Sequence, residues 1–289
     1  MIIDTHCHVI ATDTARYPLK PLFGKQSDWS AEHPLDYPDM LKADIAAGVD
    51  KAVLVQASSA YGADNSYVAD SVAAHPDRFA GVFSIDVVAP DAVEKMKYWM
   101  GKGLTGMRIF TSGSTHAAQE TFFADEAAFP AWTYASDQGL SVCMQMRVAG
   151  LPLLETVLQR FPNARIIIDH FARAEAADGP PFASAAPLWA LAKHPNVYLK
   201  LTHRPIEASE KGHATPELFL GRAVKEFGAT RIIWGSNFPA AKPPLPELIA
   251  MARKALSFLP QADQDQIFAK TALALYPTLA KKLVGGLPC

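Results

Sequence analysis

The sequence predicts a (β/α)8 TIM barrel, an α/β fold, formed as a single domain over residues 1–289. Eight short β-rich runs alternate with longer helical patterns along the chain. The middles of the short runs, such as residues 52–55 and 166–168, are continuously apolar, which is typical of parallel strands buried on both faces. With 289 residues, 49% of them hydrophobic, the chain is long enough to form one large core. A doubly wound open sheet is the alternative that the same alternation allows.

The elements follow in order from this alternation. The strands are expected at Ile2–His8, Lys51–Ala57, Phe79–Ile85, Gly103–Phe110, Leu140–Met146, Arg165–His170, Asn196–Thr202 and Arg231–Asn237. The helices are expected at Pro38–Ala47, Asn65–Ala74, Asp91–Met100, Ala127–Gln138, Leu151–Arg160, Ala185–Lys193, Pro216–Phe227, Pro246–Leu259 and Gln264–Ala274. The first helix is followed by Gly48, a residue that commonly terminates helices.

Composition excludes several classes of protein. The net charge is −2, and no long run of one sign suggests a surface for nucleic acid or for a membrane. The N-terminus lacks the basic region, apolar core and cleavage site of a secretion signal. The three cysteines, Cys7, Cys143 and Cys289, are too scattered for a disulfide framework. We therefore expect a cytoplasmic protein that acts on a small molecule.

Three long loops follow predicted strands and are the expected walls of an active site. They are Ile10–Pro38 after the first strand, Thr111–Asp125 after the fourth and Phe171–Pro187 after the sixth. All three leave the carboxyl ends of strands, where the active sites of such barrels are built.

The segment Asp4-Thr5-His6-Cys7-His8 is the strongest local signal for chemistry. Strand alternation places Asp4, His6 and His8 on one face, with Thr5 and Cys7 on the other. Two imidazoles on one rigid face can bind a metal ion or a polar substrate.

Two later strands end in polar residues that would share the barrel mouth. If Ile166 and Ile168 face the axis, His170 faces it as well and Asp169 faces away. The last strand ends in Asn237, which would project into the mouth. Gly235 would allow another group to approach the backbone closely.

These motifs together resemble the amidohydrolase superfamily. An N-terminal Asp-x-His-x-His, an Ile-Asp-His strand and a Trp-Gly-Ser-Asn-Phe-Pro strand occur here in the order and spacing of that superfamily. More narrowly, the chain is similar to the branch of lactone hydrolases that includes 2-pyrone-4,6-dicarboxylate lactonase, from Ile2 to about Tyr276. The resemblance implies a barrel hydrolase that opens a lactone, with His6, His8, His170 and Asn237 as catalytic residues.

The resemblance also implies a set of substrate-binding residues. Arg108 matches an arginine that binds a substrate carboxylate, Arg173 matches a second, and Arg204 falls near a third. Gln56, on the second strand, is expected to contact substrate as well. Arginine forks suit carboxylate oxygens because they bind them bidentately. Arg108 lies within an apolar strand and therefore needs a buried partner.

Two departures from the superfamily pattern bear on the metal. The eighth strand normally ends in an aspartate that accepts a proton from water, and this chain has Asn237. The fifth strand often carries a histidine, and this chain has Cys143-Met144-Gln145-Met146. His6, His8 and His170 could hold a catalytic zinc or another divalent ion, or could act as neutral groups in a metal-free site. We favour the metal-free site because the usual carboxylate is gone.

The group that deprotonates water is therefore open. His170 is one candidate, with a pH–rate limb expected near neutrality. His203 is another, although alternation past an inward Lys200 would turn it outward. Asp86, after the third strand, is a third candidate and would alternatively be a turn residue.

The sequence thus predicts a hydrolase that opens a small lactone carrying a carboxylate. Two alternatives stay open: a metal-dependent decarboxylase of an aromatic or related acid, and a catalytically impaired barrel that binds a small acidic ligand. The sequence does not indicate the lactone or the oligomeric state.

Overall fold

The computed structural model of the chain describes residues 1–280 and contains one eight-stranded parallel sheet. The strands are β1 (Ile3–Cys7), β2 (Lys51–Val55), β3 (Phe79–Ser84), β4 (Gly106–Phe110), β5 (Ser141–Gln145), β6 (Arg165–Asp169), β7 (Val197–Leu201) and β8 (Ile232–Trp234). They pair in sequence order from β1 to β8. All eight predicted strands are confirmed, although each is shorter than its predicted range.

The first and last strands meet and nearly close the sheet into a barrel. The amide of Asn237 donates to the carbonyl of His6 over 2.7 Å, and the amide of His8 donates to the carbonyl of Phe238 over 2.9 Å. This contact between the two ends of the sheet excludes the doubly wound alternative, whose sheet is open. The predicted TIM barrel is confirmed.

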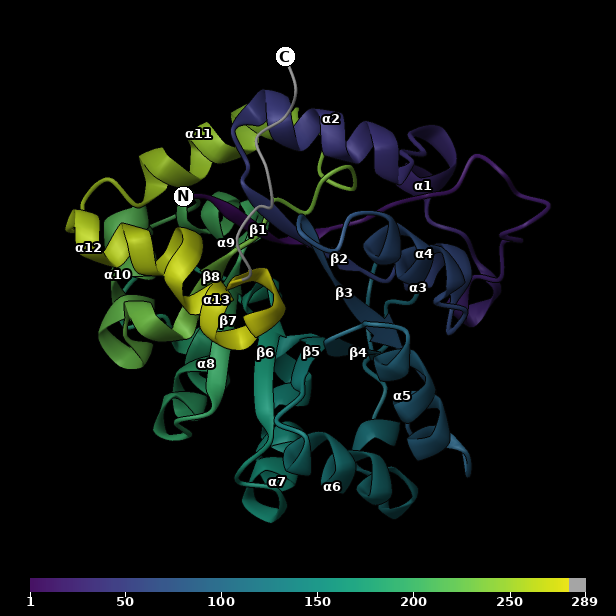
Figure 1. Cartoon of the computed structure of the whole chain (residues 1–289). Helices are drawn as coiled ribbons and strands as arrows, with labels where there is room; N and C mark the ends of the chain where they lie inside the picture. Colours follow the sequence, from purple (N-terminus) through teal and green to yellow (C-terminus); the bar gives the residue numbers. More distant parts are fainter. Residues whose placement is uncertain (281–289) are drawn as a thin grey trace.

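Helices surround the sheet (Figure 1). They are α1 (Asp28–Glu32), α2 (Tyr37–Ala47), α3 (Ser58–Tyr61), α4 (Ser66–Ala74), α5 (Ala92–Gly101), α6 (Phe129–Asp137), α7 (Leu151–Arg160), α8 (Ala186–Ala190), α9 (His203–Ser209), α10 (Pro216–Phe227), α11 (Leu245–Ala255), α12 (Gln261–Asp265) and α13 (Thr271–Leu275). The short helices α1, α3 and α9 lie in segments for which the sequence predicted no helix. Gly48 ends α2 in the left-handed conformation, as predicted, with a φ of 73°.

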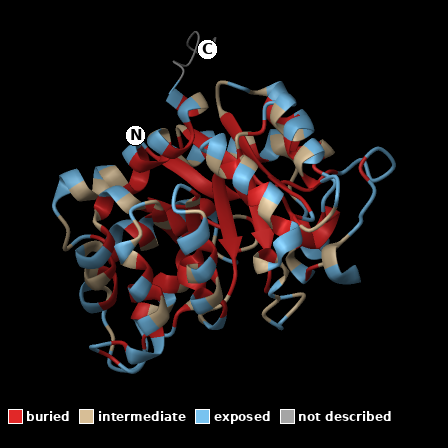
Figure 2. Cartoon of the chain, turned by 90° about the horizontal axis from the view of Figure 1, so that it is seen from below, coloured by how far each residue is buried: buried red, intermediate tan, exposed pale blue. Residues whose placement is uncertain are grey.

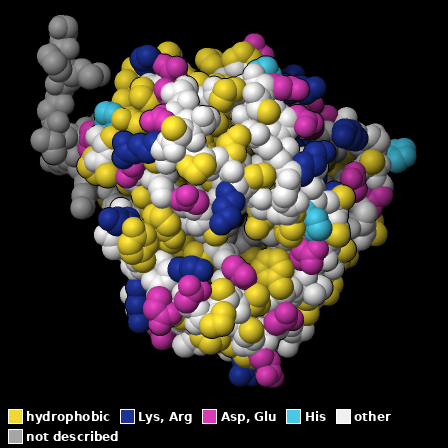
Figure 3. Space-filling view, turned by 90° about the vertical axis from the view of Figure 1, so that its right-hand side faces the viewer, with side chains coloured by type: hydrophobic (Ala, Val, Ile, Leu, Met, Phe, Trp, Pro, Cys, Tyr) yellow, Lys and Arg dark blue, Asp and Glu magenta, His cyan; other side chains and the backbone are white. Residues whose placement is uncertain are grey.

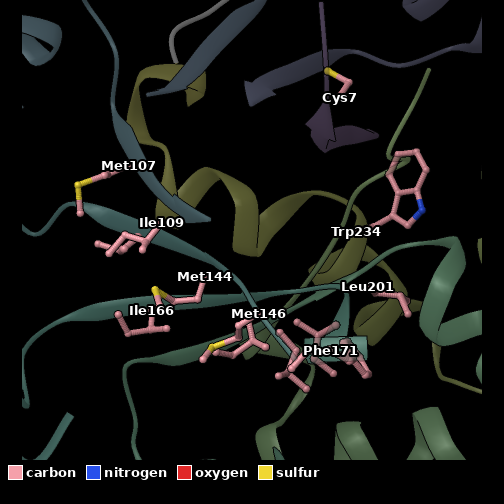
Figure 4. Packing of buried hydrophobic residues seen from close by; sticks show 14 of the residues in the cluster. Cys7, Met107, Ile109, Met144, Met146, Ile166, Phe171, Leu201 and Trp234 are labelled. Carbon is pink, nitrogen blue, oxygen red and sulfur yellow. The ribbon is translucent and has the colours of Figure 1, made fainter. Parts of the chain in front are cut away.

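The outer faces of the strands form the main core against the helices. Figure 2 shows the strands buried at the centre and the exposed residues on the outer sides of the helices. Figure 4 shows part of this core, in which Met107, Ile109, Met144, Ile166 and Leu201 project from neighbouring strands. No described helix combines the length and apolar character needed to cross a membrane.

The inner faces of the strands form a second, smaller apolar cluster inside the barrel. It contains Ile3, Val53, Val55, Ala80, Val82, Cys143, Ile167 and Ile233, together with Ala269, Ala272, Leu275, Tyr276 and Leu279. Figure 1 shows α13, in yellow, lying across this end of the barrel. The C-terminal segment therefore closes the end of the barrel opposite the mouth.

Two predictions about strand faces are wrong. In β6, Ile167 belongs to the inner cluster, whereas Ile166 and Ile168 pack against the helices, so Asp169 points inward. In β1, a bulge between Asp4 and Cys7 shifts the register, because these residues pair with Ala52 and Leu54. One extra residue at a bulge changes the face of every residue beyond it. Asp4 and Cys7 therefore share the outer face, which strict alternation did not predict.

The surface carries both signs of charge. On the face shown in Figure 3, basic and acidic side chains are interspersed and apolar side chains lie between them. That face offers no patch of one sign of the kind that binds nucleic acid.

Candidate active site

Three histidines from two distant segments meet at the mouth of the barrel. The ring of His6 lies 4.9 Å from that of His8 and 4.7 Å from that of His170, measured between centroids. All three side chains are buried, with at most 4% of each residue exposed. The structure thus brings together the three imidazoles that the sequence placed at one mouth.

The junction of β1 and β8 positions the first pair. The carboxylate of Asp4 accepts from the amides of His6, over 2.9 Å, and of Ser236, over 2.8 Å. The hydroxyl of Ser236 also donates to this carboxylate. A Cβ on Gly235 would lie 2.5 Å from the Cβ of His6, so only glycine fits this close approach, as the sequence predicted.

A left-handed turn after β6 positions His170. His170, Phe171, Ala172 and Arg173 have φ angles of 55°, 52°, 52° and 54°. Such angles are costly for residues with a Cβ and are concentrated at functional sites. The turn starts at the residue after inward-pointing Asp169 and still places His170 and Arg173 at the pocket, which alternation alone did not predict.

Beneath the histidines lies a buried charge network that the sequence analysis missed. Asp169 lies 3.0 Å from the ammonium of Lys200 and accepts from Arg108 Nε over 3.2 Å. Arg108 also donates to the side-chain oxygen of Gln145 over 2.7 Å, which confirms that it has buried partners. Burial opposes ionisation of Asp169, but Lys200 and His6 hold its pKa well below the usual value. The signal in the sequence was a charged residue inside each of three apolar strands, Arg108, Asp169 and Lys200.

His6 occupies the junction between this network and the mouth. Its Nδ1 lies 3.6 Å from a carboxylate oxygen of Asp169, and neither ring nitrogen makes a hydrogen bond within the described residues. Burial and then Lys200 lower its pKa well below the usual value, against the opposing effect of Asp169.

The other two histidines are neutral as well. Burial and the charge of Arg108 lower the pKa of His8 to about 3. Burial and the neighbouring His6 lower the pKa of His170 well below its usual value. The pH–rate limb that the sequence analysis expected near neutrality therefore moves to acid pH if His170 is the base.

A pocket opens above these groups. Its lining comes from many separate segments of the chain: His8, Trp29, Ala57, Ser58, Ser59, Arg108, Phe110, Ser114, Gln145, His170, Arg173, Arg204, Asn237 and Ala240. Seven of the eight residues named as site candidates from the sequence are at this pocket or, like His6, directly beneath it.

The exception is Gln56. Its side-chain amide donates to the carbonyls of Gly62, over 3.2 Å, and Asp64, over 2.6 Å, and it does not line the pocket. Gln56 therefore holds the loop after β2, and only its backbone carbonyl faces Arg108, at 3.4 Å.

Two arginines at the pocket form no salt bridge within the described residues. Neither Arg173 nor Arg204 pairs directly with a carboxylate of residues 1–280, although Glu207 acts electrostatically on Arg204, and Arg173 Nε is buried without a hydrogen bond. Burial, Arg204 and Arg147 lower the pKa of Arg173 to about 10. Arg147, which the sequence analysis did not single out, lines an adjoining pocket with Arg173 and Arg204. An anionic ligand would supply the missing negative charge.

The alternative bases are placed less favourably. His203 is the first residue of α9, and burial and Arg204 lower its pKa to about 4. It does not line the pocket. Asp86 is exposed and accepts from the amide of Val88 over 3.1 Å, so it acts as a turn residue.

The donor set does not fit a resident metal ion as it stands. Within the described part of the chain, no group of three or more His, Cys, Asp or Glu side chains is placed to hold one ion. Asp169, the carboxylate nearest the histidines, is already paired with Lys200 and Arg108. Asn237 offers only a neutral amide, with a φ of 62°. No step below is routed through a metal.

Curated relatives of the chain include two lactone hydrolases. It is 39% identical to L-fucono-1,5-lactonase of Burkholderia ambifaria over 93 residues, a match that spans only 32% of each chain. It is 27% identical to 4-sulfomuconolactone hydrolase of Hydrogenophaga intermedia over 245 residues, which are 82% of this chain and 74% of the relative.

Similar solved structures share the fold. A Pseudomonas putida protein assigned to the 2-pyrone-4,6-dicarboxylic acid hydrolases has a TM-score of 0.75 at 22% identity, with 96% of this chain and 97% of that one covered. A Burkholderia multivorans amidohydrolase with bound zinc has a TM-score of 0.74 at 21% identity, covering 96% and 99%. The 5-carboxyvanillate decarboxylase of Sphingomonas paucimobilis has a TM-score of 0.65 at 15% identity, covering 96% and 98%.

The family itself follows from the sequence match. The sequence model of the amidohydrolase family matches residues 3–278, nearly the whole chain. This chain belongs to the amidohydrolase family.

Proposed function

We propose that this chain hydrolyses a small lactone that carries a carboxylate group. The observation that carries the proposal is the pocket in which neutral imidazoles of His8 and His170 lie with two arginines that form no salt bridge within the described residues, Arg173 and Arg204. The names of the two curated relatives support a lactone as the substrate class.

Each part of the pocket has a role in this reaction. Arg173 and Arg204 bind the carboxylate and so orient the ring. The imidazoles contact the lactone carbonyl and the attacking water, and stabilise the negative charge that develops on the carbonyl oxygen. Asn237 holds water or substrate through its amide. Arg108 is held by Asp169 and Gln145 and forms part of the floor of the pocket.

A lactone panel with product analysis tests the proposal. We expect ring opening to a hydroxy or oxo acid without release of carbon dioxide, and faster turnover of carboxylate-bearing lactones than of their neutral analogues. Metal analysis of the untreated protein, run beside the panel, tests directly whether the site works without a bound metal ion. Release of carbon dioxide from an aromatic acid would support the decarboxylase instead.

A variant of Arg173 sharpens the substrate class. Arg173→Met removes charge-assisted hydrogen bonds worth about 1.5–3 kcal/mol, so KM for a carboxylate-bearing lactone should rise roughly 10- to 100-fold. KM for a neutral lactone should change little. Arg160→Met is the matched control, because the Arg160 guanidinium lies 4.3 Å from the Phe129 ring centroid, away from the pocket. Equal losses for both kinds of lactone would contradict the assignment.

The impaired barrel that only binds an acid is the second candidate, and it rests on Asn237. Asn237→Asp restores the superfamily residue at the pocket. Loss of an existing lactonase activity in this variant would support a repurposed site. A large gain of hydrolysis over an inactive parent would support the impaired barrel.

A further inference from the structure

Two histidines of the pocket are held at Nδ1 by different kinds of partner. His8 Nδ1 lies 2.8 Å from the carbonyl oxygen of Val55. His170 Nδ1 lies 2.8 Å from the hydroxyl oxygen of Thr202. A carbonyl oxygen only accepts, whereas a hydroxyl both donates and accepts. These partners therefore decide which nitrogen of each ring carries the proton.

The tautomer of His8 follows from its carbonyl partner. A neutral imidazole has one N–H, and in His8 it must be on Nδ1 because the Val55 carbonyl cannot donate. The Nε2 of His8 then carries a lone pair. Within residues 1–280 the His8 ring is hydrogen-bonded only at Nδ1, and the ring lines the pocket. His8 thus offers the substrate an acceptor.

The tautomer of His170 follows from the burial of Thr202. Thr202 is 0% exposed, and within residues 1–280 its hydroxyl is hydrogen-bonded only to His170. If His170 were the donor, the hydroxyl proton would be buried without an acceptor, which costs about 1–3 kcal/mol. Donation from Thr202 to Nδ1 avoids this cost. The proton of His170 is then on Nε2, on the side of the ring left free for the pocket.

We propose that His8 and His170 face the lactone as opposite neutral tautomers, His8 accepting and His170 donating, and that Thr202 is the positioning residue that keeps His170 in its donor form. The chemical meaning of this pair rests on the proposed lactone hydrolysis. Neither tautomer was expected from the sequence, which named His170 as one of three candidate bases.

The pair separates the two tasks of hydrolysis. The oxygen of water bonds to the carbonyl carbon while His8 Nε2 takes one of its protons, and the carbonyl π electrons move to the oxygen. The Nε2–H of His170 donates to that oxygen as its negative charge develops. When the C=O bond re-forms, the ring C–O bond breaks and the leaving oxygen takes the proton back from His8. This arrangement supplies the base that Asn237 cannot.

Nitrogen NMR of the histidine rings tests the tautomers without any substrate. In the full chain labelled with ¹⁵N in its histidines, long-range proton–nitrogen correlations at neutral pH separate the two tautomers. We expect the His8 ring to be protonated at Nδ1, with signals that are absent in His8→Gln. We expect the His170 ring to be protonated at Nε2, with signals that change in Thr202→Val. Protonation of His170 at Nδ1 in the parent protein would overturn the proposal.

Two variants of Thr202 give the functional test. Thr202→Val keeps the shape but removes the hydroxyl, so the His170 signals should report loss of the Nε2–H form. Turnover should fall about 100-fold, the usual effect of losing one oxyanion donor, with KM nearly unchanged. Thr202→Ser restores the hydroxyl, and should restore both the tautomer and most of the turnover. A Thr202→Val protein with parental His170 signals would contradict the role of Thr202.

The outcomes also separate this inference from the proposed function. Opposite tautomers in a protein that hydrolyses no lactone would leave the arrangement standing and reject lactone hydrolysis. Lactone hydrolysis by a protein in which both rings carry the proton on the same nitrogen would support the proposed function and reject the opposite tautomers. A folded Thr202→Val protein, checked by circular dichroism, is required for either conclusion.

Discussion

The barrel interior differs at its two ends, although the same strands line both. Toward the closed end, the inward residues are apolar, such as Val53, Ile167 and Ile233, and they pack on the C-terminal segment. Toward the mouth, β6 and β7 place Asp169 and Lys200 inward instead. On β6 the change occurs within two residues. Stability and chemistry are thus assigned to different levels of one barrel, the division expected for this fold.

The largest predicted effect comes from breaking the charge network at the mouth. Asp169→Asn leaves Lys200 and Arg108 without their carboxylate inside the barrel, and removing one partner of a buried ion pair typically costs about 3–5 kcal/mol. Urea unfolding followed by circular dichroism measures this loss. Asp169→Asn/Lys200→Met should recover part of it, because the double variant no longer buries the unpaired ammonium.

A surface pair provides the control for this prediction. Asp91 lies 2.9 Å from Lys95 on α5, and both side chains are about half exposed. Asp91→Asn should cost no more than about 1 kcal/mol, because water screens such pairs. Equal losses for the buried and the exposed variants would contradict the importance assigned to the network.

The next largest effect comes from the apolar end. Ile167→Ala leaves a cavity in the inner cluster, where Ile167 is 0% exposed, and should cost about 2–5 kcal/mol. Turnover of any lactone should stay within a few-fold of the parent at a temperature where the variant is folded. A loss of turnover without a loss of stability would break the division between the two ends.

The smallest effect concerns a carboxylate outside the barrel. Asp44 on α2 is as buried as Asp169, but within residues 1–280 it forms no salt bridge and its Oδ1 makes no hydrogen bond. Burial and the nearby Asp4 therefore raise its pKa well above the usual value, the opposite of Asp169. A raised pKa gives stability that is present in acid and lost as pH rises through the folded-state pKa.

Asp44→Asn should therefore stabilise the protein at neutral pH and have no benefit in acid, by an amount within about 2 kcal/mol. Urea midpoints measured across pH check the prediction. Asp39→Asn is the control, because Asp39 lies on the same helix and is exposed. A gain that is the same at every pH would rule out the ionisation of Asp44 as its cause.

The fold was predictable because its signals are periodic. Eight buried strands separated by helices leave a pattern that survives errors of a few residues at each end. The need of Arg108 for a buried partner was predictable too, since an arginine inside an apolar strand must be paired. Which residue pairs with it was not, because Asp169 was assigned to the wrong face.

The errors at the site have local causes. The bulge in β1 and the left-handed turn after β6 each break the period of two on which the face assignments depended. The meeting of the three histidines at one mouth was nevertheless predicted correctly. It follows from their location at the ends of strands, which depends less on strict alternation than the assignment of a residue to one face does. Gln56 was assigned to substrate by resemblance alone, and its contacts with Gly62 and Asp64 show a loop-holding role.

The turn from His170 to Arg173 ties two distinct tasks to a single piece of backbone. The His170 ring, for which we propose contact with the lactone carbonyl, and the Arg173 guanidinium, for which we propose contact with the acid group, are three residues apart on it. Any substitution that relaxes these four conformations, such as glycine at 172, shifts both groups at once. Selection for a new substrate at this position would therefore alter rate and affinity in concert, whereas changes at Arg204 leave the reacting groups in place.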